Sequence, residues 1–221
     1  MSDTATASSR IKQLIPVLSF TAAYLVAAVA GSIAAGNTEF ILYIVIMLVL
    51  GSVVWFADRR VGFSPLVLWG LSGWGLVHMA GGLIAVPEAW PINGEHRVLY
   101  SLWLVPDLLK YDHVVHAYGF GVTTLVCWEG LCAILKAQNA HYEASVPVPT
   151  FGMLTLCGAA SMGFGGLNEV IEFFLTLTLP ETNIGGYINT GWDLVSNLVG
   201  VVVACILIAW RYRTPVKPDQ S

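Results

Sequence analysis

Nine polar side chains able to ligate a metal or carry a proton lie inside or at the edge of long apolar stretches of this chain. They are His78, Asp112, His113, His116, Asn168, Glu169, Glu172, Asp193 and Asn197. Imidazole and carboxylate groups are the usual protein ligands of zinc, iron and manganese, and they also act as general acids and bases. Because an ionised group is costly in hydrocarbon, such residues indicate a functional site.

The spacing of these residues places them on shared helix faces. Four-residue spacing separates the members of three pairs: Asp112 and His116, Asn168 and Glu172, and Asp193 and Asn197. Side chains three or four residues apart stack on one side of a helix. Each helix is therefore predicted to carry a stripe of ligands or hydrogen-bonding groups.

The composition identifies the class of protein that must position these stripes. The chain has 221 residues, of which 56% are hydrophobic and only 11% are charged, and its mean hydropathy is +0.72. Ordinary soluble domains carry about 25% charged residues. We therefore predict an all-α, polytopic membrane helical bundle formed by one integral membrane domain over residues 1–221. The net charge of −4 gives no basic surface for nucleic acid, so the lipid bilayer is the expected partner.

Six apolar segments are long enough to cross a bilayer, since a spanning helix needs roughly 20 apolar residues. They are residues 15–36, 40–57, 62–86, 111–135, 150–179 and 191–210. Polar tails precede and follow them at 1–10 and 211–221. An outer loop at 87–110 contains the apolar segment 99–105, which is too short to span and is expected to be interfacial or re-entrant.

The distribution of basic residues orients the bundle. With the N-terminus in the cytoplasm, eight Lys and Arg residues face the cytoplasm and only Arg97 and Lys110 lie outside. This excess predicts that both termini are cytoplasmic. All nine polar residues then fall in the outer half of the membrane, whereas Glu129 lies in the inner half.

Glu169 and Glu172 have the strongest need for partners inside the bundle. A carboxylate at mid-helix costs about 2.5–3.5 kcal/mol, so the pair facing lipid would cost on the order of 6 kcal/mol. Small residues before them, among them Gly158, Ser161 and Gly165, allow close helix packing. We therefore expect both carboxylates to face neighbouring helices.

These considerations suggest a distribution of roles. The expected metal ligands are His78, His116, Glu169 and Glu172, and the expected ion is a divalent transition metal such as zinc, iron or manganese. Asp112 and Asp193 are candidate catalytic or orienting residues. Asn168, Asn197 and His113 are candidates for ligand binding or a polar network, with His113 expected to turn toward the solvated interface.

Four motifs, in order, resemble the YjdF-like bacterial inner-membrane proteins. They are His78-Met79-Ala80-Gly81-Gly82, Tyr111-Asp112-His113-Val114-Val115-His116 with Gly119, Asn168-Glu169-Val170-Ile171-Glu172, and Trp192-Asp193 with Asn197 and Gly200. The order is also similar to that of VanZ-like proteins. The resemblance covers about residues 65–205 and implies a multipass protein of the bacterial inner membrane.

Two departures from the YjdF-like pattern affect a second outer loop, expected at residues 180–190, and the helix before it. A "GTQGD" stretch is replaced by residues 185–191, and Phe173 and Phe174 stand where a Trp follows the acidic motif. The family supplies no established reaction. The link of VanZ-like proteins to glycopeptide-antibiotic tolerance points only to a role in the envelope. A metal site open to the outer face could activate water against an envelope or lipid-linked substrate.

Three functions remain open from the sequence. The cluster could be a metal or catalytic site, a structural polar network that joins helices, or part of a small-solute or proton-coupled transporter. A transporter needs polar residues in both halves of the membrane, and the inner half offers only Glu129. That asymmetry weighs against a conducting pathway.

The orientation can be checked directly. A reporter fused after Ser221 is expected to give a cytoplasmic signal, because the basic residues favour that side. The measurement is a paired alkaline phosphatase and fluorescent-protein fusion at that position. High phosphatase activity at the C-terminus would invert the predicted depth of all nine residues.

Overall fold

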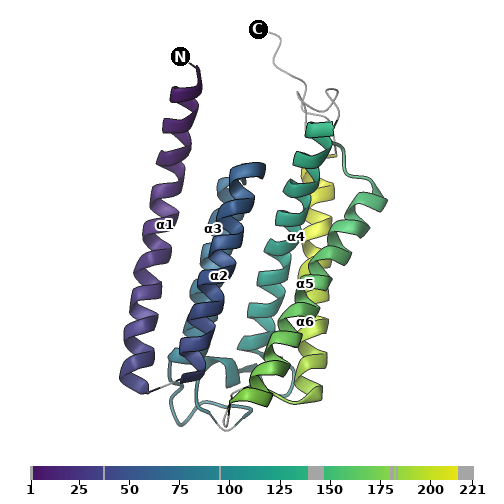
Figure 1. Ribbon diagram of the computed structural model, residues 1–221. Helices are drawn as coiled ribbons and strands as arrows, with labels where there is room; N and C mark the ends of the chain where they lie inside the picture. The colour runs from purple at the N-terminus through teal and green to yellow at the C-terminus, as the bar shows by residue number, and fades with distance from the viewer. Residues whose placement is uncertain are drawn as a thin grey trace. The chain divides into compact units, whose positions relative to one another are not determined.

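A computed structural model describes residues 2–36, 38–94, 96–138, 147–179, 182 and 184–213 of the chain. Within these ranges the protein is built from six α-helices (Figure 1). They are α1 (Ser2–Ala35), α2 (Thr38–Val61), α3 (Pro65–Leu83), α4 (Tyr111–Gln138), α5 (Phe151–Thr178) and α6 (Tyr187–Arg211). The predicted all-α membrane bundle is confirmed, and each helix overlaps one of the six predicted apolar segments.

Among the residues that the structure describes, four helical stretches are long and apolar enough to cross a membrane. They are Arg10–Ala34, Pro65–Leu83, Tyr111–Gln138 and Tyr187–Arg211. Large apolar side chains are exposed on them, such as Val26 and Ile206, as expected of helices that face lipid. Three expectations stay predictions: the count of six spans, the single membrane domain and the cytoplasmic termini. Residues 214–221 of the predicted C-terminal tail lie outside the described residues.

The chain divides into two compact units. The first consists of Met1–Trp55 and Ser64–Tyr111, and the second of Phe56–Phe63 and Asp112–Ser221. In the first unit, α1 packs against α3, where the hydroxyl groups of Thr21 and Ser72 share a hydrogen bond of 2.6 Å. Ser64 caps α3 by accepting a bond from the Val67 amide, and Pro65 begins the helix.

The predicted outer loop is an ordered segment of the first unit. The short apolar segment at 99–105 forms a 3-10 turn (Leu99–Ser101) and strand β1 (Trp103–Val105), which pairs antiparallel with β2 (Leu109–Lys110). Nη2 of Arg97 donates to the carbonyl oxygens of Pro87, Glu88 and Trp90 at 2.6–2.9 Å. One guanidinium group therefore holds together the turn that follows α3.

The second unit brings α4, α5 and α6 side by side (Figure 1). The Ser161 hydroxyl on α5 donates to the carbonyl oxygen of Phe120 on α4 at 2.8 Å. Gly200 on α6 lies so close to α4 that a Cβ added there would overlap the carbonyl oxygen of Ala117. Small residues thus let the three backbones approach each other, as anticipated for helices that pack within a membrane.

This close approach predicts a stability effect for a single methyl group. Gly200→Ala is expected to destabilise the protein by about 1–3 kcal/mol, because the obstructing atom is backbone and cannot rotate away. Thermal unfolding in detergent measures the change. Gly191→Ala, on the same helix but with nothing within 4 Å of its added Cβ, is the matched control. Equal melting temperatures for the two variants would contradict this account of the α4–α6 contact.

Candidate metal centre

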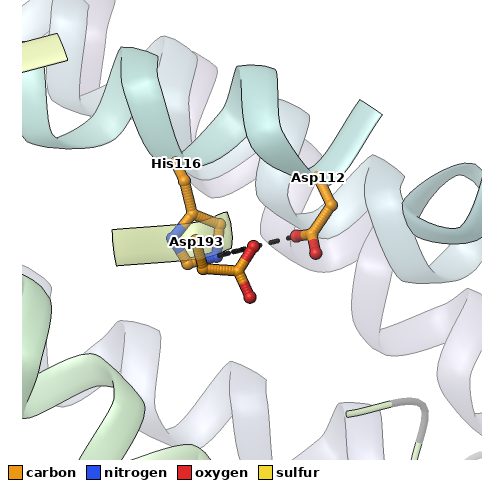
Figure 2. Close-up of side chains that lie close together, drawn as sticks. All are labelled: Asp112, His116 and Asp193. Carbon is orange, nitrogen blue, oxygen red and sulfur yellow. Dashed lines mark ion pairs between the residues drawn. The ribbon is translucent and has the colours of Figure 1, made fainter. Parts of the chain in front are cut away.

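His116 is the central residue of the polar cluster in the second unit. Its side chain projects from α4, is buried, and faces Asp112 one helical turn earlier. Nε2 of His116 lies 3.6 Å from Oδ1 of Asp112 and 4.0 Å from Oδ1 of Asp193, which comes from α6. Figure 2 shows these three side chains pointing toward one another. One edge of the imidazole therefore faces two carboxylates from two helices.

The other edge of the imidazole is held by Asn197. Nδ1 of His116 lies 3.1 Å from Oδ1 of Asn197 and 4.0 Å from Oε1 of Glu169 on α5. A carboxamide oxygen only accepts hydrogen bonds, so the Nδ1 atom of His116 carries the proton that is donated. In the neutral ring the lone pair is then on Nε2, directed toward Asp112 and Asp193.

Two further hydrogen bonds orient the carboxylates. Nδ2 of Asn189 donates to Oδ2 of Asp193 at 2.5 Å, and Nδ2 of Asn168 donates to Oε1 of Glu172 at 2.9 Å. Both bonds join residues four positions apart on one helix. Asn189 was not among the predicted site residues, although its spacing from Asp193 is the signal that would have identified it.

Within the described part of the chain, two sets of potential ligands share His116. The first is Asp112, His116 and Asp193, and the second is His116, Glu169 and Glu172. Within each set, one ligand atom per residue lies within 4.8 Å of the others. In a tetrahedral zinc site with bonds of about 2.0–2.2 Å, two ligand atoms lie about 3.3–3.6 Å apart. The side chains of either set would therefore have to rotate inward by up to about 1.5 Å to share one ion.

His113 does not occupy the solvated position expected from the sequence. It is only 4% exposed, and its ring stacks on that of Trp192 with centroids 5.9 Å apart. The prediction was wrong because Trp192, at the start of α6, covers the face of α4 that the spacing had directed outward. His113 therefore contributes to packing between α4 and α6 next to the cluster.

His78 belongs to the first unit. The Tyr100 hydroxyl lies 2.5 Å from its Nδ1 atom and donates to its carbonyl oxygen at 2.9 Å. The rings of Tyr43 and Trp74 lie within 6 Å of the imidazole, at 5.7 and 5.3 Å between centroids. These contacts surround His78 with aromatic side chains, and its predicted role as a metal ligand stays a prediction.

The fold and the cluster together define a polytopic α-helical membrane protein with a buried histidine–carboxylate centre. The chain belongs to the family described as "Predicted membrane protein (DUF2238)", whose model matches residues 16–214. No curated protein and no solved structure matches the chain. The family match spans both units and all nine predicted site residues.

The hydrogen bond between His116 and Asn197 predicts that replacing Asn197 destabilises the protein more than replacing Asn168 does. Asn197→Ala is expected to destabilise the protein by about 1–3 kcal/mol, since Asn197 is fully buried and its loss leaves the His116 Nδ1 donor without its acceptor. Asn168→Ala, which removes a half-buried asparagine from the bond to Glu172, should cost less. Chemical unfolding of both variants in detergent tests this order, and the reverse order would refute it.

Proposed function

We propose that the second unit binds a divalent transition metal through Asp112, His116 and Asp193. The observation that carries this proposal is the arrangement around one imidazole: Asn197 accepts from Nδ1, and Nε2 faces two carboxylates at 3.6 and 4.0 Å. Metal-binding histidines usually donate their other ring N–H to an oxygen acceptor, which fixes the tautomer. Asn197 provides this acceptor for His116.

The donor set favours zinc, iron or manganese. One imidazole with two carboxylates is a mixed nitrogen and oxygen donor set, which zinc, iron and manganese all accept. Three protein ligands leave a coordination position for water, and a metal bound there would supply a hydroxide at neutral pH. Under this proposal Asp112 and Asp193, first considered as catalytic residues, become ligands.

The proposed substrate is an envelope or lipid-linked molecule, and the proposed location is the bacterial inner membrane. Both follow from the predicted placement of the cluster in the outer half of the bilayer and from the resemblance to YjdF-like and VanZ-like proteins. A site open to the outer leaflet would meet substrates presented at the membrane surface.

A structural polar network is the second candidate function. It is favoured by the three asparagine hydrogen bonds, which reach His116, Glu172 and Asp193. Such a network would stabilise the helices without any ion. The two functions differ in whether the protein binds metal at a defined stoichiometry.

Cobalt titration separates the two functions. The purified protein, stripped of metal by dialysis against chelator, is expected to bind Co²⁺ and to show d–d absorption bands typical of mixed nitrogen and oxygen ligation. Asp112→Asn and Asp193→Asn should each weaken Co²⁺ binding by about 100-fold or more. Loss of a residue that only hydrogen-bonds to a metal ligand already lowers metal affinity by about 10–100-fold, and loss of a ligand itself should cost more. Glu129→Gln, a carboxylate change elsewhere on α4, is the matched control and should leave this affinity unchanged.

Two outcomes would contradict the metal site. One is a wild-type protein that binds no Co²⁺ and contains no metal by elemental analysis after purification without chelator. The other is wild-type affinity in Asp112→Asn and Asp193→Asn while both remain folded. Either result would favour the structural network.

A further inference from the structure

Glu169 is a buried carboxylate, and neither of its oxygens accepts a hydrogen bond of normal length and angle from the described residues. Its side chain is only 9% exposed, and both oxygen atoms are buried. The polar groups recorded around it are Nδ1 of His116, 4.0 Å from Oε1, and the side chains of Asn168 and Thr190. Because leaving a buried carboxylate without normal hydrogen bonds costs several kcal/mol, its oxygens point to a ligand that replaces them.

Glu172 lies one turn further along α5 on the same side as Glu169. Oε1 of Glu172 accepts from Nδ2 of Asn168 at 2.9 Å, which restricts its rotation. Ligand atoms of Glu169, Glu172 and His116 lie within 4.8 Å of one another. Two carboxylates of α5 therefore lie close to the Nδ1 edge of the His116 ring, whereas the proposed metal is on the Nε2 edge.

Asn197 provides an independent sign of a ligand at the same place. Its side chain is fully buried, and its Oδ1 atom accepts the hydrogen bond from His116. Its Nδ2 group has no acceptor among the described residues. Nδ2 packs against Gly165, where an added Cβ would approach it to 2.7 Å. Since Gly165 precedes Glu169 by one turn on α5, the Asn197 amide of α6 lies against the face of α5 that carries Glu169.

We infer that Glu169 and Glu172 hold a second divalent cation, so that the cluster is a two-metal centre. This inference rests on the proposed first metal at Asp112, His116 and Asp193. His116 Nδ1 is engaged by Asn197, so the second ion takes carboxylate oxygens and water as ligands. Oxygen ligation of this kind suits Mn²⁺ or Mg²⁺. The Nδ2 group of Asn197 then donates to an oxygen atom bound to that ion.

The formal charge of the cluster supports two ions. The carboxylates of Asp112, Asp193, Glu169 and Glu172 together carry a formal charge of −4, and a neutral His116 adds none. One divalent cation leaves a charge of −2 among apolar helices, whereas two cations balance it. Uncompensated charge in a low-dielectric interior is strongly unfavourable, so the second ion stabilises the carboxylates that the first does not reach.

Manganese titration tests the second site. Metal-free wild-type protein in detergent is expected to bind two equivalents of Mn²⁺, measured by the loss of the free-ion electron paramagnetic resonance signal. Glu169→Gln and Glu172→Gln should each bind one equivalent, because the isosteric amide loses the charge but keeps the shape. Glu129→Gln should still bind two equivalents, and circular dichroism with size-exclusion chromatography checks that every variant is folded.

The outcomes distinguish this inference from the proposed function. One equivalent in the wild type, retained in Glu169→Gln and lost in Asp112→Asn, would overturn the second ion and keep the first. Two equivalents in both glutamate variants would also overturn the second ion. One equivalent that is lost in Glu172→Gln but retained in Asp112→Asn would instead overturn the first site, and no bound ion would overturn both.

Discussion

The hydrogen bond between Nδ1 of His116 and Oδ1 of Asn197 determines the chemistry of the cluster. It joins α4 to α6 in the interior of the second unit, where both side chains are buried. By placing the proton on Nδ1, it leaves the lone pair on Nε2 and directs it toward Asp112 and Asp193. The carboxylate of Glu169 then lies on the donor side of the ring, so the two edges of one imidazole face different groups.

That hydrogen bond requires the helices to be unusually close. Gly200 allows the backbone of α6 to reach the carbonyl of Ala117, and Gly165 leaves room for the Asn197 carboxamide against α5. A side chain at either glycine would separate the helices or displace Asn197. The small residues thus have a specific role beyond general packing, since they bring polar groups of three helices within reach of each other.

The sequence predicted the fold class, and helical spacing predicted which polar side chains share a helix face. Apolar segments of sufficient length predicted six helices, and four-residue spacing predicted that Asp112 faces His116 and that Asn168 faces Glu172. It did not predict the bond from Asn189 to Asp193, because the sequence places Asn189 in the loop expected at residues 180–190, whereas α6 already begins at Tyr187. It also misplaced His113, since burial of that ring depends on Trp192 from another helix. The strand pair after α3 was missed because its segments are only two and three residues long.

The sequence by itself determined which side chains share each helix face, because the period of a helix fixes the relative directions of residues three and four positions apart. It also determined that the acidic residues of α5 must face other helices, through the cost of ionised groups in lipid. Only the tertiary structure decided which nitrogen of His116 meets which carboxylate. That choice depends on how far each helix is rotated about its axis and how far apart neighbouring axes lie. Both are set by packing between segments that are distant in the chain; His116 and Asn197, for example, are 81 residues apart. No spacing within a single helix carries that information.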